Sequence, residues 1–492
     1  MMKSIKRWAC ILLTLVLLTG SVCVSVTAAN APKKFRAACA DGALVLRWNA
    51  VAGAESYVLL KQNARGEWIR KNGASPTSTT FTDAKVKDAH SYNYRVYAVV
   101  NGNKGAAAAL KATYLAPPQI TKFVNRANGI QLKWKRCAAA AQYTLYRLNT
   151  RGAWERIATL GAGTRSYLDR NVTGGTKYTY TLRQTSGSTV SAFKKNGFRH
   201  VFVSPVTGLT VKNSPKGVIL RWNAVAEAKT YEVLRKVPGG SWTTVKTVKR
   251  TTTQMVDAAA PYGKKCFYLV RALRPNNVGA NGTVEAVFAV DPTKPMIALT
   301  YDDGPYRPTT NQVLDVLEKY NARATFFVVG NRLATYSDCL AREASLGCEI
   351  GCHTYNHTTL TSASDTTIAN EIANTNALIA QYSGQTPRLL RAPGGAINSR
   401  VQSVVGYPLI QWSVDTRDWE HRNTQTTINH VKTHASDGAI VLMHDIHAPT
   451  ANAAEGVVSY LVGQGYQLVT VSEMMDAKGI TMQNGSVYYR AG

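Results

Sequence analysis

Residues 296–305 read Met-Ile-Ala-Leu-Thr-Tyr-Asp-Asp-Gly-Pro, and this is the most informative stretch of the chain. A short apolar run ends there on two adjacent carboxylates, Asp302 and Asp303, at a tight turn. Like charges a few ångströms apart oppose each other's ionisation unless a cation or a separate task divides them. One member of the pair is therefore expected to hold a metal, although Asp-Asp-Gly is also an ordinary turn sequence.

A second motif, His353-Thr354-Tyr355-Asn356-His357, begins 50 residues after Asp303. Its two imidazoles can meet on one side of a helical turn or compact loop and complete an Asp/His/His ligand set. The alternative is a pair of surface histidines that share this spacing by accident. Thr354 stands where a metalloprotease H-E-x-x-H motif has its glutamate, so a general base must come from elsewhere, and Asp302 is the free carboxylate.

Buried strands that alternate with helices are predicted after Pro292. Near-continuous apolar runs cover residues 324–329, 409–414 and 438–443, and helical stretches cover residues 310–320 and 366–382. This alternation is typical of a parallel α/β sheet or barrel, whose site lies at the C-terminal ends of the strands. Candidate groups follow three of these strands: Asp302-Asp303, then Asp415 and Asp418, then His444-Asp445.

The N-terminal half contains a unit that occurs three times. Each copy has a tryptophan, a tyrosine 9 residues later, a second tryptophan at 20 residues and an aspartate at 35 residues. The landmarks are Trp48, Tyr57, Trp68 and Asp83; Trp134, Tyr143, Trp154 and Asp169; and Trp222, Tyr231, Trp242 and Asp257. Periods of 86 and 88 residues with shared landmarks indicate a true repeat. Alternating strands between Gly, Asn, Ser and Pro turns, with no convincing helix, predict a small antiparallel sandwich for each copy.

The three units resemble fibronectin type III domains in their early tryptophan and their tyrosine-rich later strand. We place the repeats at residues 30–116, 117–204 and 205–291, and a catalytic module at residues 292–492. The first tryptophan of each unit is expected in the core between the sheets. The second tryptophan lies next to a turn and is the better candidate for an exposed aromatic side chain.

The N-terminus has the pattern of an export signal. Lys3, Lys6 and Arg7 precede an apolar run to about Val26, and small residues end the segment at position 29. Residues 1–29 therefore predict a cleaved secretory signal, with an uncleaved anchor as the alternative. We expect a secreted protein, extracellular or associated with the cell wall, with no integral membrane domain after cleavage.

Cysteine usage does not indicate a disulfide scaffold. Six cysteines remain after position 29 in a long chain, which is too few for such a framework. Cys339 and Cys348 could form a disulfide. Cys352, beside His353, could be a soft metal ligand, but a buried thiol without a metal is favoured, because cysteine commonly behaves as a small hydrophobe.

After the signal, the excess of positive charge lies in the repeats. The chain has a net charge of +29 at pH 7, whereas residues 294–492 contain 14 Lys and Arg against 17 Asp and Glu. The repeats should therefore be attracted to polyanions, and for an exported protein these are anionic wall polymers rather than nucleic acid. The alternative is that the repeats are spacers with a basic surface.

Residues 294–476 resemble the polysaccharide deacetylase family, also called carbohydrate esterase family four. Five segments in order carry the resemblance: residues 300–304, residues 353–357, Arg391-Ala392-Pro393-Gly394-Gly395, Asp415-Thr416-Arg417-Asp418-Trp419, and Leu442-Met443-His444-Asp445. The resemblance implies a distorted (β/α) barrel and metal-dependent removal of N- or O-acetyl groups from a glycan.

The resemblance also implies a role for each site residue. Asp303, His353 and His357 would hold a divalent ion, most often Zn²⁺, with Co²⁺, Mn²⁺ or Ni²⁺ as alternatives. Asp302 would be the general base, paired with Arg391, and His444 would be the general acid, held by Asp418. The backbone N–H of Gly394 would stabilise the oxyanion, and Trp419 and Leu442 would form the slot for the acetyl methyl group.

The expected function is deacetylation of peptidoglycan N-acetylglucosamine. The alternatives are a deacetylase of chitin oligomers or acetylxylan, and a wall-binding protein with an inactive deacetylase module. One departure from the family bears on substrate fit: Gly394 stands where many relatives carry an aromatic residue, which removes a wall of the groove.

Overall fold

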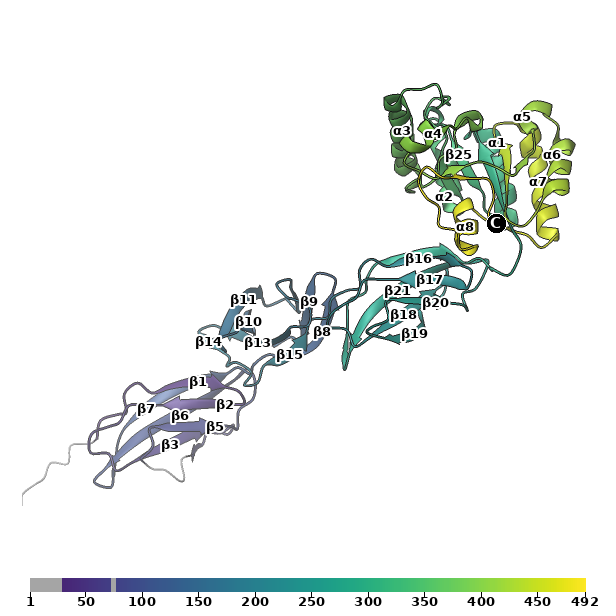
Figure 1. The fold of residues 1–492 in the computed structure, drawn as a ribbon. Coiled ribbons are helices and arrows are strands. Elements are labelled where there is room, and N and C mark those ends of the chain that lie inside the picture. The colour runs from purple at the N-terminus through teal and green to yellow at the C-terminus, as the bar shows by residue number, and fades with distance from the viewer. Residues whose placement is uncertain (1–28, 72–76) are drawn as a thin grey trace, which may run out of the picture. The chain divides into compact units, whose positions relative to one another are not determined.

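The computed structural model describes residues 29–71 and 77–492 (Figure 1). The predicted signal at residues 1–29 lies outside these residues except for its last position. The chain forms two compact units, one of residues up to 123, 132–167 and 178–200, and one of residues 124–131, 168–177 and 201–492. Among the described residues, no helix is long and apolar enough to cross a bilayer.

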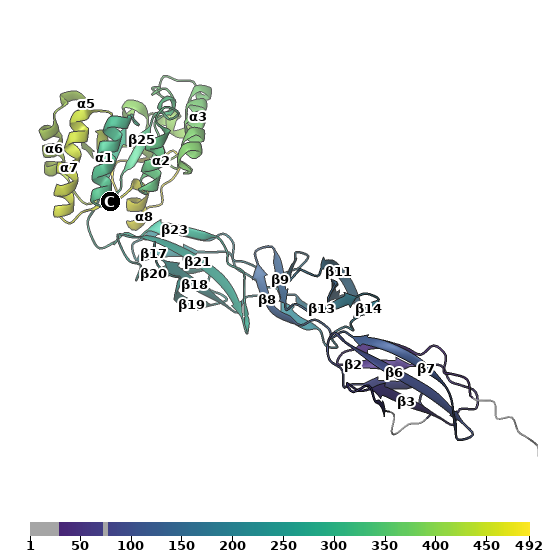
Figure 2. The same cartoon turned by 180° about the vertical axis from the view of Figure 1, so that it is seen from behind.

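The N-terminal half consists of antiparallel sheets, and helices appear only in the C-terminal part of the described chain (Figure 1 and Figure 2). In the first repeat, a sheet of order β1-β2-β5 accompanies one of order β4-β3-β6-β7. Their bounds are β1 Arg36–Ala40, β2 Ala43–Arg47, β3 Ser56–Gln62, β4 Trp68–Arg70, β5 Thr80–Asp83, β6 His90–Val100 and β7 Asn103–Tyr114.

The second and third repeats have the same pair of sheets. The smaller sheets have orders β12-β9-β8 and β16-β17-β20, and the larger ones have orders β11-β10-β13-β14 and β19-β18-β21-β22, with β15 on β13 and β23 on β21. In the second repeat the bounds are β8 Ile120–Arg126, β9 Gly129–Trp134, β10 Gln142–Leu148, β11 Trp154–Gly161, β12 Ser166–Asp169, β13 Lys177–Ser186, β14 Thr189–Val190 and β15 Phe198–Val201. In the third they are β16 Thr210–Ser214, β17 Gly217–Arg221, β18 Thr230–Lys236, β19 Thr243–Lys249, β20 Gln254–Asp257, β21 Lys265–Arg274, β22 Asn277–Val278 and β23 Val284–Phe288. The prediction of three antiparallel β units is confirmed, while their boundaries at residues 116, 204 and 291 stay predictions.

The first tryptophan of each repeat is a core residue, as predicted. Trp48, Trp134 and Trp222 are 5%, 3% and 4% exposed. Each meets the tyrosine nine residues later edge-on, with ring centres 5.6, 5.9 and 5.7 Å apart. The hydroxyl of that tyrosine accepts a hydrogen bond from the backbone N–H six residues before it in all three copies, which fixes the turn between the two strands.

The aspartate 35 residues after the first tryptophan is buried in all three repeats and has a charged partner in the first and third. Lys61 Nζ donates to Asp83 Oδ2 at 2.5 Å, and the hydroxyl of Tyr94 donates to the same oxygen at 2.6 Å. In the third repeat, Arg235 and Tyr268 donate to Asp257 in the same way, at 2.5 and 2.8 Å. A buried carboxylate needs such partners, so the recurring aspartate of the first and third repeats reflects a buried ion pair in each.

The C-terminal part is built on a parallel sheet of order β26-β25-β24-β29-β28, with β30 paired to β24. The ladder continues from Cys352 through Leu390 to Leu409, β27 pairs β31, and Arg490 bridges back to Ala439. These bridges close the sheet into a ring, which agrees with the predicted distorted barrel. The strands are β24 Met296–Asp302, β25 Thr325–Val328, β26 Glu349–Cys352, β27 Leu409–Ile410, β28 Val414–Asp415, β29 Ala439–His444, β30 Gln467–Leu468 and β31 Val487–Tyr488.

Helices surround these strands (Figure 1). Their bounds are α1 Arg307–Lys319, α2 Ser337–Ser345, α3 Asp365–Ser383, α4 Ser399–Val404, α5 Asp418–His421, α6 Thr424–His434, α7 Ala448–Gly463 and α8 Val471–Ala477, with short 3₁₀ turns at Gly330–Arg332 and Pro393–Gly395. The helices predicted at residues 310–320 and 366–382 are therefore present. The strand predicted over residues 409–414 is wrong as one element, because the chain turns between β27 and β28.

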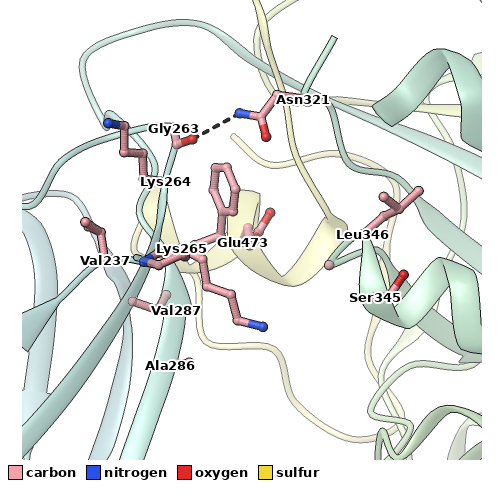
Figure 3. A pocket seen from close by; sticks show the side chains of 13 residues that line it. Val237, Gly263, Lys264, Lys265, Ala286, Val287, Asn321, Ser345, Leu346 and Glu473 are labelled. Carbon is pink, nitrogen blue, oxygen red and sulfur yellow. Dashed lines mark hydrogen bonds between the residues drawn. The ribbon is translucent and has the colours of Figure 1, made fainter. Parts of the chain in front are cut away.

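The third repeat packs against the barrel within the second compact unit. Asn321 donates to the carbonyl of Gly263 at 3.0 Å, and the guanidinium of Arg323 lies 3.2 Å from the ring centre of Phe288. Figure 3 shows the side chains that line the open cavity beside these contacts, which has a volume of about 720 Å³.

The six cysteines of the described chain are free thiols. Cys339 and Cys348, the pair that could have formed a disulfide, are both buried and are not joined. Their burial raises the pKa of each thiol to about 12, so both behave as small apolar side chains.

The buried pair of the first repeat can be tested by removing its carboxylate. Asp83→Ala leaves Lys61 charged in a nearly dry site, so we expect the free energy of unfolding of this repeat to fall by about 3–5 kcal/mol. Native-state hydrogen exchange of the β2 and β6 amides, followed by mass spectrometry on the whole chain, measures this free energy. Glu67→Ala, at an exposed carboxylate of the same repeat, should change it by less than about 0.5 kcal/mol. Equal protection in the two variants would contradict this account.

Candidate active site

The candidate groups gather at the C-terminal ends of β24, β26 and β29, as parallel strands require. They line a cavity of about 480 Å³ formed by Asp302, Asp303, His353, His357, Gly394, Gly395, Trp412, Asp415, Trp419, Leu442 and His444. Gly304 allows the turn after β24, because a Cβ there would lie 2.4 Å from the buried carboxylate of Asp445. The close approach explains why glycine follows the two aspartates.

Asp303, His353 and His357 form a cluster whose ligand atoms lie within 4.8 Å of one another. Asp303 Oδ1 is 3.1 Å from His357 Nε2 and 3.4 Å from His353 Nε2. Burial works against ionisation of Asp303, but the two imidazoles hold the pKa of its carboxyl well below the usual range. A carboxylate and two imidazoles facing one point are the donor set that zinc and similar ions prefer, so these residues fit a divalent metal.

The two histidines are oriented by groups behind them. His353 Nδ1 lies 2.8 Å from the carbonyl oxygen of Arg391, which fixes the Nδ1–H tautomer and leaves the lone pair of Nε2 toward Asp303. The segment from 353 to 357 is a compact loop, since Thr354 and His357 have φ of 62° and 57°. Glu371 of α3 holds this loop by accepting the backbone N–H groups of residues 355 and 356 at 2.7 and 2.8 Å.

The other aspartate of the pair belongs to Arg391. This guanidinium is 0% exposed, and its Nη1 donates to Asp302 Oδ1 and to Thr300 Oγ1, both at 2.7 Å. Its remaining N–H groups donate to the carbonyls of Ile410 and Gln411 at 3.0 Å. Asp302 Oδ2 is left facing the cavity, 3.8 Å from His353 Nε2.

His444 and Asp418 form a second pair across the cavity. His444 Nδ1 lies 2.9 Å from Asp418 Oδ1, and Asp418 Oδ2 accepts the backbone N–H of His444 and the hydroxyl of Thr450 at 2.8 and 2.6 Å. Burial alone would lower the pKa of His444, but the bond to Asp418 and the nearby carboxylates raise it to about 9. The imidazole is therefore positively charged at neutral pH, with Nε2 free to donate.

The walls of the cavity contain the remaining predicted residues. Leu442 is buried, Trp419 is 48% exposed, and Gly394 has φ of 62° with open space where a side chain would begin. Trp412 also lines the cavity and was missed, because the sequence places it in an apolar run that predicts only a strand.

The sequence did not predict a role in the site for two further residues. Glu371 supports the histidine loop from a helix, where a lone glutamate gives no signal. Thr300 was quoted in the first motif but given no role, although it shares Arg391 with Asp302. Cys352 is 1% exposed, has its pKa raised to about 12 by burial, and lies outside the metal-ligand cluster, as favoured from the sequence.

Comparison with known proteins places this geometry in context. Residues 289–407 match the family described as polysaccharide deacetylase. The chain is 43% identical over 189 residues to peptidoglycan-N-acetylmuramic acid deacetylase PdaC of Bacillus subtilis. The aligned region covers 38% of this chain and 40% of that protein. It is 35% identical over 274 residues to peptidoglycan-N-acetylglucosamine deacetylase PgdA of Listeria monocytogenes. This aligned region covers 55% of the chain and 54% of PgdA.

A shorter relative is covered almost completely. A peptidoglycan-N-acetylglucosamine deacetylase of Bacillus cereus is 38% identical over 191 residues, which is 37% of this chain and 89% of that protein. By contrast, the chain spans only about half the length of PdaC and PgdA. The similarity to the Bacillus cereus protein therefore concerns one whole module.

Metal binding by this cluster can be tested with two histidine variants. His357→Ala removes a proposed ligand. Loss of a residue that only hydrogen-bonds to a metal ligand typically lowers metal affinity by about 10–100-fold, so we expect the affinity for Zn²⁺ to fall by more than about 100-fold here. The measurement is Zn²⁺ content after dialysis against a competing chelator. His434→Ala is the matched control, because His430 and His434 share the spacing on α6 away from the cavity. Equal Zn²⁺ content in the two variants would contradict the assignment.

Proposed function

This chain belongs to the polysaccharide deacetylase family, and we propose that it removes N-acetyl groups from the amino sugars of cell-wall peptidoglycan. The observation that carries the proposal is that two adjacent carboxylates have different partners. Asp303 faces His353 and His357, whereas Asp302 is paired with the buried Arg391. Hydrolysis of an amide needs both a site for a metal and a base beside it, and this arrangement offers both.

The residues have distinct tasks in the proposed reaction. A divalent ion, which we take to be Zn²⁺, would be held by Asp303, His353 and His357 and would polarise the acetyl carbonyl and make water more acidic. Asp302 accepts the proton of the attacking water, and Arg391 holds this carboxylate in place at the edge of the cavity. The backbone N–H of Gly394 donates to the oxyanion that develops on the acetyl oxygen.

Breaking the amide also requires a proton for the leaving nitrogen. His444 supplies it, because its pKa of about 9 keeps the imidazole protonated near neutral pH. Asp418 is a positioning residue that holds Nδ1, so that Nε2 points into the cavity. Trp419 and Leu442 line the cavity and bound the slot for the acetyl methyl group.

Peptidoglycan is favoured as the substrate by the names of the relatives. PgdA and the Bacillus cereus protein are described as N-acetylglucosamine deacetylases, and PdaC as an N-acetylmuramic acid deacetylase. We propose N-acetylglucosamine as the substrate sugar and N-acetylmuramic acid as the second candidate. The proposed location is extracellular, with the basic repeats on the anionic wall, and the complete set of site residues argues against an inactive wall-binding protein.

Acetate release from purified peptidoglycan tests this function. We expect the Zn²⁺-loaded chain to release acetate, and Asp302→Asn to slow it by about 10²–10⁴-fold through loss of the general base. Asp365→Asn, at an exposed carboxylate of α3, is the control and should keep the wild-type rate. Mass spectrometry of fragments released by a glycan-cleaving enzyme would show glucosamine for the first candidate and muramic acid for the second. Release from chitin oligomers or acetylxylan but not from peptidoglycan would refute the substrate assignment.

The role of His444 predicts a change in the pH dependence. The general acid works only while it is protonated, so the rate should fall as the pH rises through the pKa of His444. Asp418→Asn removes the strongest of the interactions that raise this pKa and leaves burial opposed only by the charges of Asp302 and Asp303, so the pKa of His444 should fall toward its ordinary value. The alkaline limb of kcat should therefore move to lower pH.

The control for this profile is Asp437→Asn, at a carboxylate paired with Lys478 away from the cavity. Its profile should match that of the wild type. An alkaline limb that stays in place in Asp418→Asn would assign that limb to a group other than His444.

A further inference from the structure

Positive charge is densest in the second repeat. Residues 117–204 contain 15 Lys and Arg and only two acidic residues, Glu155 and Asp169. Asp169 is 3% exposed, so Glu155 is the one acidic side chain that this repeat turns to solvent. Such a field attracts polyanions but does not by itself distinguish one polyanion from another.

An aromatic cluster lies on the outer face of the sheet β11-β10-β13-β14. Phe193 stacks on Trp154 with ring centres 5.8 Å apart at 14°, and Tyr146 meets Phe193 edge-on at 4.9 Å. The guanidinium of Arg183 lies 4.7 Å from the ring centre of Phe193, and the exposed Arg156 stands opposite Tyr146 in the strand register. The three rings are only half-buried, so each keeps part of its surface in contact with solvent.

The same position carries an indole beside a cation in the other two repeats. Arg95 lies 4.3 Å from the ring centre of Trp68, and Lys236 Nζ lies 5.4 Å from that of Trp242. Both indoles are half-buried. Neither belongs to the hydrophobic core of its sandwich, which is built on the first tryptophan and its tyrosine. Packing of the core therefore does not explain why the second tryptophan recurs.

We propose that these three sites, Trp68 with Arg95, Trp154 and Phe193 with Arg183, and Trp242 with Lys236, bind the glycan strand of peptidoglycan. A hexosamine ring has an apolar face of C–H groups that can stack on an indole, and the peptide stems of the polymer carry carboxylates that pair with the adjacent cation. Polyol phosphates provide the negative charge without a ring to stack. The combination of ring and cation thus selects an anionic polymer made of sugars.

Three weak sites on one chain bind a repetitive polymer far more tightly than one site does. Once one repeat is bound, the others meet the same strand at high effective concentration. The inference adds a ligand and its contact residues to the repeats and rests on the proposed substrate, but its test is a binding measurement that does not require catalysis.

The test is co-sedimentation of the full mature chain with insoluble peptidoglycan from which phosphate polymers have been removed. At about 0.15 M salt, we expect the double variant Trp68→Ala/Trp242→Ala to bind at least about tenfold more weakly, through lost stacking and lost avidity. Ile69→Ala is the matched control, since Ile69 is a neighbouring apolar residue that is 41% exposed and has no ring. It should bind as the wild type does.

Two further arms make the outcome decisive. Arg95→Gln/Lys236→Gln should weaken binding and reduce its dependence on salt. Inorganic polyphosphate should compete only partly, because it has charge without rings. Binding of Trp68→Ala/Trp242→Ala at the wild-type level, or binding of the wild type only to walls that retain phosphate polymers, would overturn the proposal.

A soluble acetylated oligosaccharide separates this proposal from the proposed activity. A chain too short to span the repeats needs only the barrel, so the tryptophan variants should release acetate from it at the wild-type rate. Failure of the wild type on this substrate would refute the deacetylase activity and leave the sedimentation result standing.

Discussion

The ion pair between Arg391 and Asp302 is the interaction on which the site depends. Both groups are nearly dry, at 0% and 4% exposed, and burial lowers the pKa of Arg391 while the carboxylate opposes that shift. Breaking such a pair costs about 3–5 kcal/mol, because the remaining charge stays buried. Arg391 also binds the carbonyls of Ile410 and Gln411, so the pair fastens the end of β24 to the region of β27. The proposed base and the barrel wall are fixed by the same contacts.

Two of the three proposed metal ligands, and Thr354 between the two histidines, have strained backbone. Asp303, Thr354 and His357 have φ of 70°, 62° and 57°, a region that costs a non-glycine residue of order 1–3 kcal/mol. Glu371 compensates by accepting two N–H groups of the histidine loop, and burial pins β24 below Asp303. The ligand atoms are thus brought together by the fold before any ion is bound, which favours one geometry over the many that a flexible loop would allow.

The sequence allowed prediction of those parts of the site that local patterns encode. Asp302 and Asp303 follow a continuous apolar run, which predicts a buried strand. Their place at the end of that strand, where parallel sheets have their sites, was therefore predictable. The contact between Arg391 and Thr300 was not, because it joins segments 91 residues apart through side-chain geometry alone. Trp412 was missed for a related reason: it lines the cavity from the break between β27 and β28, where an unbroken strand was predicted.

For the proposed activity on a polymer, the distribution of charge separates holding the polymer from releasing it. Each deacetylation adds an amine to the polymer and makes it less negative. The affinity of a strongly basic catalytic site for the polymer would therefore change as the reaction proceeds. Residues 294–492 avoid this with 14 basic and 17 acidic residues, while the repeats carry the excess of positive charge. Each new amine on the glycan also reduces its attraction to the basic repeats. A chain organised in this way would leave a treated stretch of wall and bind again where acetyl groups remain.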